Sequence, residues 1–144
     1  MTRPPVSEPP ATHRWVDHTS EVELEVWAPD FAGVLAEAAR ALAGLLLRNR
    51  DAEPEGEPRV LEVESHDREA LLVDWLNEVL FVAETRMWVP VRFEVLDASA
   101  THARVRTWGV PVDEAPSMVK AATFHGLEVR EGADGCEAEV IFDV

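Results

Sequence analysis

The sequence predicts an α+β protein, a two-layer sandwich in which two main helices pack on one face of a mixed or antiparallel β-sheet. Two long segments carry apolar residues at helical spacing, and several shorter segments alternate apolar and polar residues as half-buried strands do. The connections late in the chain are mainly of hairpin length. Because 144 residues suffice for one hydrophobic core, we expect a single domain over residues 15–144.

The N-terminal part begins with a region that cannot build a core. Residues 1–14 contain four prolines among small and polar residues, so we expect a flexible tail. Residues 21–27 alternate strictly and predict a strand. Asp30 can then accept hydrogen bonds at a helix N-terminus, and an apolar stripe from Phe31 to Leu46 predicts the first helix. Residues 49–58, rich in acids and prolines, predict a loop.

The second helix is marked by Ser65 and Asp67 as start signals and by an apolar stripe from Leu72 to Ala83. Alternation predicts strands on both sides of it, and Gly132 to Gly135 predict a turn before the last strand. The remaining predicted elements are strands over residues 60–64, 89–95, 103–107, 124–129 and 137–144, and a loop over residues 109–116.

The composition is 47% hydrophobic and 28% charged, which is typical of a soluble globular protein. No apolar stretch approaches the roughly 20 residues of a membrane helix, so no membrane association is expected. There is no apolar segment of a secretory signal. Cys136 is the only cysteine, which excludes an internal disulfide and a multi-cysteine zinc site. We therefore expect a cytoplasmic protein.

The formal net charge is −15, and the isoelectric point is about 4.6. Nucleic-acid affinity comes largely from lysine and arginine contacts to phosphates, so direct binding of nucleic acid is not expected. An acidic surface is better suited to cations or to a basic face of another protein.

One set of carboxylates could bind a metal ion. If the first and last strands present their polar residues on the same sheet face, Glu21 and Asp143 converge, with the terminal carboxylate of Val144 beside them. Such oxygen donors suit a hard divalent cation. The alternative is a solvated sheet face whose acids are partly opposed by Arg104 and Arg106 across neighbouring strands.

Two further groups of polar residues have both a chemical and a structural interpretation. Lys120 and His125 could transfer protons or hold a phosphate, but with no placed nucleophile they specify no reaction and could simply compensate the acidic cluster. Asp17, His18 and Thr19 combine an acid, an imidazole and a hydroxyl, yet consecutive residues point in different directions, which favours a turn or strand-entry motif. On the second helix, a solvated stripe is expected for Asp74, Asn77 and Glu78.

Four runs, in order along the chain, resemble signatures of the archease family. Residues 17–21 (DHTSE) are similar to its N-terminal Asp-His-Thr-Ala-Asp run, and residues 71–78 (LLVDWLNE) match its second helix. Residues 120–125 (KAATFH) resemble its Lys-Ala-Val/Ile-Thr-Tyr-His run, and residues 141–144 (IFDV) resemble its Ile-x-Asp-Val/Ile end. The resemblance spans the chain from about Trp15 to its last residue.

The resemblance implies an accessory protein, not itself an enzyme, of the tRNA-splicing RNA ligase RtcB. That ligase joins RNA ends carrying a 2′,3′-cyclic phosphate or 3′-phosphate to 5′-hydroxyl ends with GTP and Mn²⁺, and archease promotes its guanylylation and multiple turnover. The family's metal ligands fall on Glu21, Asp143 and Val144.

Position 21 departs from the family pattern, because a glutamate stands where the family has an aspartate. Flexible Ca²⁺ sites accept the extra methylene more readily than octahedral Mg²⁺ sites, so we expect Ca²⁺, with Mg²⁺ or Mn²⁺ as alternatives. Asp17 could supply a compensating carboxylate, and His18, Lys120 and His125 are candidate supporting residues.

Two other functions compete with ligase activation. A general protein-binding chaperone or adaptor with incidental metal binding needs only the acidic surface. A stand-alone metal-dependent hydrolase would need a nucleophile or base constellation, and the sequence offers none that we identify.

Overall fold

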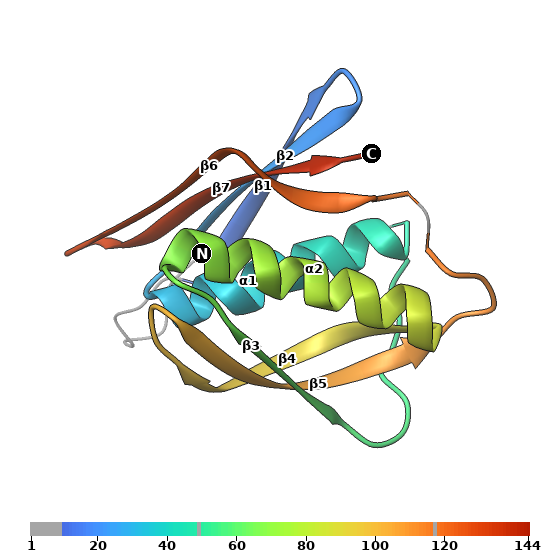
Figure 1. Cartoon of the computed structure of the whole chain (residues 1–144). Coiled ribbons are helices and arrows are strands. Elements are labelled where there is room, and N and C mark those ends of the chain that lie inside the picture. Colours follow the sequence, from blue (N-terminus) through green and yellow to red (C-terminus); the bar gives the residue numbers. More distant parts are fainter. Residues whose placement is uncertain (1–9, 49, 117) are drawn as a thin grey trace, which may run out of the picture.

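The computed structural model describes residues 10–48, 50–116 and 118–144, which form seven strands and two helices (Figure 1). The first half of the chain contains β1 (Thr12–His18), β2 (Glu21–Ala28), α1 (Phe31–Leu46), β3 (Arg59–Glu64) and α2 (Arg68–Arg86). The second half contains β4 (Trp88–Ala98), β5 (His102–Pro111), β6 (Ala121–Gly132) and β7 (Gly135–Asp143).

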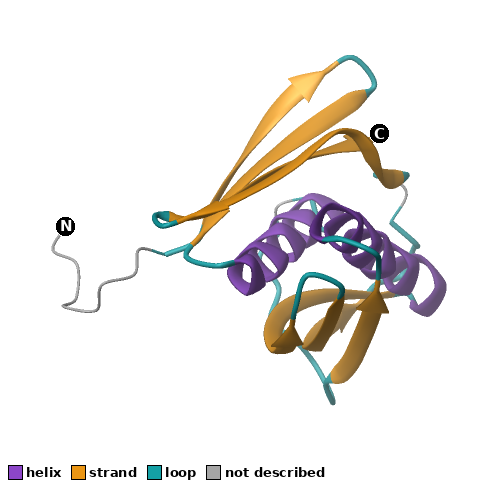
Figure 2. Cartoon of the chain, turned by 60° about the vertical axis from the view of Figure 1, so that its left-hand side comes forward, coloured by secondary structure: helices purple, strands orange, loops and turns teal. Residues whose placement is uncertain are grey.

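The described strands form two antiparallel sheets with both helices between them (Figures 1 and 2). Sheet A has four strands in the order β1-β2-β7-β6, and sheet B has three in the order β3-β5-β4. The predicted α+β class and the packing of two helices on antiparallel strands are confirmed. The strands, however, divide into two sheets, so the helices form a middle layer with a sheet on either side.

The helices have two sheets as partners because their buried surface is wider than one stripe. On α1, Ala39, Ala41 and Ala43 are buried in addition to the predicted stripe. On α2, Val73 and Val82 are buried in the same way. As a result α1 contacts both β2 and β4, and α2 contacts both β6 and β3. Because the helices carry apolar surface on two sides, each side has to be covered by its own sheet.

Both helices begin where the sequence predicts. Asp30 Oδ1 accepts a hydrogen bond from the Gly33 amide at 2.8 Å, and Asp67 Oδ1 accepts one from the Ala70 amide at 2.8 Å. Each cap satisfies one of the free amides in the first turn. Neither helix in the described part of the chain is long and apolar enough to cross a membrane.

Several predicted boundaries differ from the structure, and in two places a segment predicted to lie outside the strands belongs to one. Residues 12–14 of the predicted tail belong to β1, where Thr12 pairs with Trp27. Residues 1–9 of that tail and position 49 of the predicted loop lie outside the described residues. Strand β5 also continues to Pro111, into the predicted loop over residues 109–116, because Pro111 pairs with Trp88 of β4. Pairing with a neighbouring strand determines where β1 begins and where β5 ends, and the composition of these segments does not reveal that pairing.

Candidate functional site

The structure brings Glu21 and Asp143 together. Strand β2 pairs with β7 so that these two residues are direct Cα partners. One residue further toward the end of the sheet, the Val144 amide donates to the Ser20 carbonyl at 3.2 Å. Hydrogen-bonded and non-hydrogen-bonded pairs alternate in an antiparallel ladder, and the second kind has the closer side chains. Glu21 and Asp143 therefore form a close, non-hydrogen-bonded pair on one face of sheet A.

A second acidic pair on the same two strands has positive side chains beside it. Glu25 and Glu139 are also direct partners. Glu25 Oε1 lies 2.8 Å from Arg14 Nη2, and Glu139 Oε1 lies 3.5 Å from Arg130 Nη2. Like charges directly opposite one another destabilise a strand pair, and the two guanidinium groups offset that repulsion.

The pair at the end of the sheet has no such counter-charge among the residues that the structure describes. Over residues 10–48, 50–116 and 118–144, no arginine, lysine or histidine forms an ion pair with Glu21 or Asp143. Asp143 is exposed and Glu21 is half-buried. A cation between the two carboxylates would relieve their repulsion.

The third predicted ligand, Val144, lies beside the pair through its main chain, which bonds to Ser20. Within the described parts of the chain, no group of three or more histidine, cysteine, aspartate or glutamate side chains is arranged to hold a metal ion. The donors available here are thus two carboxylates and the main-chain oxygen of Val144. Carboxylate and main-chain oxygens, completed by water, fit a hard cation such as Ca²⁺ or Mg²⁺.

The two predicted supporting residues of β1 lie on opposite faces of sheet A. His18 is the Cα partner of Glu21 and shares its face, and its Nε2 lies 3.1 Å from Glu23 Oε1. Asp17 is the partner of Val22, and successive residues of a strand point to opposite faces. Asp17 therefore points to the face opposite to that of Glu21, and the compensating carboxylate that it could supply stays a prediction.

Of the two predicted supporting residues of the 120–125 run, Lys120 lies immediately before β6 and His125 lies within it. The Lys120 amide donates to the Asp143 carbonyl at 2.9 Å, so Lys120 adjoins the pair through its main chain. His125 lies in an irregular stretch of β6, between the pairs made by Thr123 and Glu128. Its amide donates to the Thr123 hydroxyl at 3.3 Å. No hydrogen bond joins either side chain to Glu21 or Asp143 in the part of the chain that the structure describes.

Asn77, which we expected in a solvated stripe of the second helix, instead contacts the main chain of β6. Its Oδ1 accepts from the Ala122 amide at 2.8 Å, and its Nδ2 donates to the Ala122 carbonyl at 3.2 Å. Because Ala121 is the Cα partner of Asp143, this contact holds β6 next to the acidic pair. Helical periodicity gives no sign of this role. The only sequence signal was the position of Asn77 within the run over residues 71–78.

Cys136 has no feature of a nucleophile. It is fully buried on the inner face of β7, and this burial raises the pKa of its thiol. A raised pKa lowers the fraction of reactive thiolate at neutral pH.

Comparison with known proteins identifies the family to which the chain belongs. Residues 13–144 match the family model described as "Archease protein family (MTH1598/TM1083)". The chain belongs to the archease family. Two archeases illustrate the similarity: that of Methanopyrus kandleri is 32% identical, with 90% of this chain and 96% of that protein covered. That of Methanothermobacter thermautotrophicus is 31% identical, with 89% and 95% covered.

Solved structures show the same archease fold. The solution structure of protein 1598 of Methanobacterium thermoautotrophicum has a TM-score of 0.74 at 28% identity, covering 92% of this chain and 98% of that one. The crystal structure of an archease from Thermotoga maritima, described as a possible chaperone, has a TM-score of 0.58 at 20% identity, covering 90% and 94%. At that identity the second likeness concerns the fold alone. The archease match includes Glu21, Asp143 and Val144.

Proposed function

We propose that this chain activates an RtcB-type RNA ligase, promoting guanylylation of the ligase and its multiple turnover. On this proposal the chain is an accessory protein of tRNA splicing, and its partner carries out the reaction on RNA. The observation that supports it is the pairing of Glu21 with Asp143, without a counter-charge among the described residues, in a chain of the archease family.

The proposal includes a divalent cation held by Glu21, Asp143 and the main-chain oxygen of Val144. We expect Ca²⁺, with Mg²⁺ or Mn²⁺ as alternatives, because the donors are hard oxygens and a glutamate contributes one of them. The bound cation would supply positive charge for contact with phosphate or carboxylate oxygens of the partner. The pairing of β2 with β7 in sheet A holds the main chain of Glu21 beside that of Asp143, which supports this assignment.

The test is ligase guanylylation in the presence of Asp143→Asn, which keeps the size of the side chain and removes its charge. We expect the stimulation to fall by about tenfold or more, since even indirect partners of a metal site change its affinity by about 10- to 100-fold. Asp134→Asn is the matched control, because Asp134 is an exposed aspartate in the turn between β6 and β7. Glu21→Asp should retain the stimulation.

Undiminished stimulation by Asp143→Asn would show that the proposed site is wrong. Calorimetric titration of the same variants with Ca²⁺ separates two causes of a loss. If Asp143→Asn binds Ca²⁺ as the unsubstituted protein does and still fails to stimulate, the carboxylate contacts the ligase and the metal assignment is wrong.

A chaperone or adaptor with incidental metal binding is the second candidate function, and the net charge of −15 favours it because it suits basic protein partners. Purification of the tagged chain from its native host distinguishes the two. A mixture of clients without an RNA ligase supports the chaperone, whereas enrichment of the ligase alone supports the activator.

A further inference from the structure

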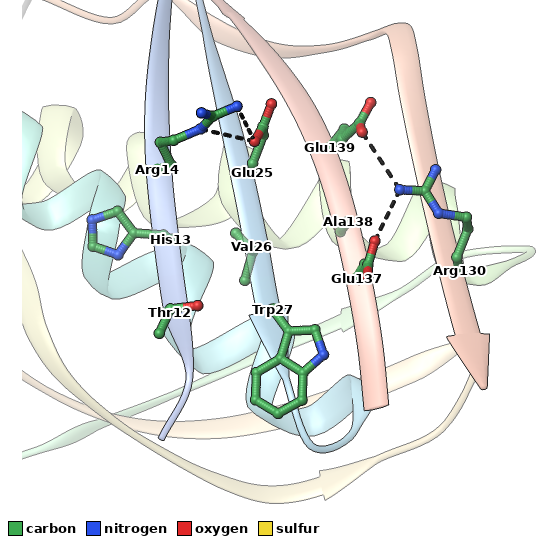
Figure 3. Close-up of a pocket in the computed structure, with 10 residues that line it drawn as sticks. All are labelled: Thr12, His13, Arg14, Glu25, Val26, Trp27, Arg130, Glu137, Ala138 and Glu139. Carbon is green, nitrogen blue, oxygen red and sulfur yellow. Dashed lines mark hydrogen bonds and ion pairs between the residues drawn. The ribbon is translucent and has the colours of Figure 1, made fainter. Parts of the chain in front are cut away.

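A cleft of about 270 Å³ lies on the outer face of sheet A, the face turned away from the helices (Figure 3). Arg14 and Glu25 are ion-paired on one side of it, and Arg130 lies between Glu137 and Glu139 on the other. Trp27 lines the cleft between the two sides. We refer to this feature, defined by these six residues, as the Trp27 cleft.

The surroundings of the Trp27 cleft carry more negative than positive charge. The cleft itself is lined by three glutamates and two arginines, and Glu128 adds a further carboxylate beside Arg130. Arg130 shows what this surface binds: its guanidinium lies 2.5 Å from Glu128, 3.0 Å from Glu137 and 3.5 Å from Glu139. Hydrogen bonds to Glu128 and Glu137 raise the pKa of Arg130, so its charge is permanent.

The indole of Trp27 is held in place by the turn between β6 and β7. A Cβ atom at Gly135 would lie 2.7 Å from Trp27 Cζ2, so the ring packs directly on the glycine backbone. Trp27 is half-buried. An aromatic ring held in this way loses little conformational entropy when a ligand binds, and its face attracts cations.

We propose that the Trp27 cleft binds an arginine side chain from a basic segment of a partner protein. The guanidinium stacks on Trp27 and is hydrogen-bonded by the carboxylates of Glu25 and Glu139. The excess of carboxylates selects a cation over a phosphate. Arginine suits the cleft better than lysine because its planar group stacks on aromatic rings and forms paired hydrogen bonds with carboxylates.

This contact is separate from the proposed metal site and does not depend on it. Trp27 and Glu21 are six residues apart on β2, which corresponds to about 20 Å along a strand. The two features therefore provide two points of contact along the same outer face of sheet A.

The probe is acetyl-tri-arginine amide, titrated in the presence of EDTA while the indole N–H signals are followed by NMR. The Trp27 signal is assigned by its loss in Trp27→Phe. We expect this signal to shift, and we expect Trp27→Leu to weaken binding about two- to fivefold. Glu139→Gln keeps the shape of a side chain on the outer face of the sheet and removes its charge, and it should weaken binding to a similar extent. Tri-lysine amide should bind more weakly than tri-arginine amide.

The control is Trp108→Leu, which changes a half-buried tryptophan on a β5 strand of sheet B and should leave the affinity unchanged. Equal affinity of Trp27→Leu, Glu139→Gln and the unsubstituted protein would overturn the proposal, and so would a stronger Trp27 response to a short oligoribonucleotide than to the peptide. Asp143→Asn should bind the peptide normally, so a failure of this proposal is distinguishable from a failure of the metal site.

Discussion

Replacing Asn77 with alanine removes the two hydrogen bonds that hold the start of β6 against α2. Strand β6 is an edge strand of sheet A, and the Asn77 amide takes the place of a further strand at Ala122. Ala122 is only 5% exposed, so water cannot fully replace the lost partners. Two net hydrogen bonds of about 1 kcal/mol each, and part of the cost of leaving buried groups unpaired, give a loss of about 2–4 kcal/mol in the free energy of unfolding.

Urea unfolding followed by circular dichroism measures this loss, and hydrogen exchange at the Ala122 amide locates it. A loss of this size lowers the melting temperature by roughly 5–15 °C in a domain of this length. Glu84→Ala is the control, because Glu84 is exposed on the same helix and should change stability by less than about 0.5 kcal/mol. If Asn77→Ala and Glu84→Ala have the same stability, the two hydrogen bonds do not hold β6 in place.

Two further predictions concern sheet B. The hydrogen bond to Glu62 raises the pKa of His102 above 6.5. The stability that this pair contributes is therefore complete below pH 6.5 and is lost as the pH rises through the raised pKa. In an NMR titration, Glu62→Gln should return the pKa of His102 toward 6.5. An unchanged pKa would contradict the assignment. A Cβ atom at Gly109 would lie 2.5 Å from Trp88 Cε2, so Gly109→Ala should cost about 1–3 kcal/mol in urea unfolding. Gly132→Ala, with no atom within 4 Å of the added carbon, is the control, and equal losses would refute the explanation.

Local signals were sufficient for the helices and for the strands that form the acidic pair. Asp30 and Asp67 start the two helices because a short oxygen-bearing side chain satisfies the first free amides, and this requirement is visible in the sequence. The alternation over residues 21–27 and 137–143 separates a buried face from an outer face in each strand. Alternation brings Glu21 and Asp143 to one face only in registers that place them opposite each other or an even number of residues apart, and in the structure they are direct partners.

The division into two sheets could not be predicted in the same way. Periodicity identifies the residues that face the interior, but it does not indicate whether one sheet or two sheets cover them. The alanines of α1 illustrate the difficulty, because Ala39 and Ala41 are small enough to be read as neutral helix formers and yet are buried. The role of Asn77 is equally invisible, since its partner is the main chain of Ala122, 45 residues away.

The contrast between the two acidic pairs of β2 and β7 is the strongest physical argument for a function at the end of sheet A. Glu25 and Glu139 each have an arginine beside them, so the sheet can provide counter-charges where repulsion would cost stability. Glu21 and Asp143 occupy the equivalent kind of position and have none among the described residues. A local arrangement that opposes folding is expected mainly where it serves binding or catalysis. This contrast is why we propose a cation-binding site for the pair, in place of one more part of a solvated face.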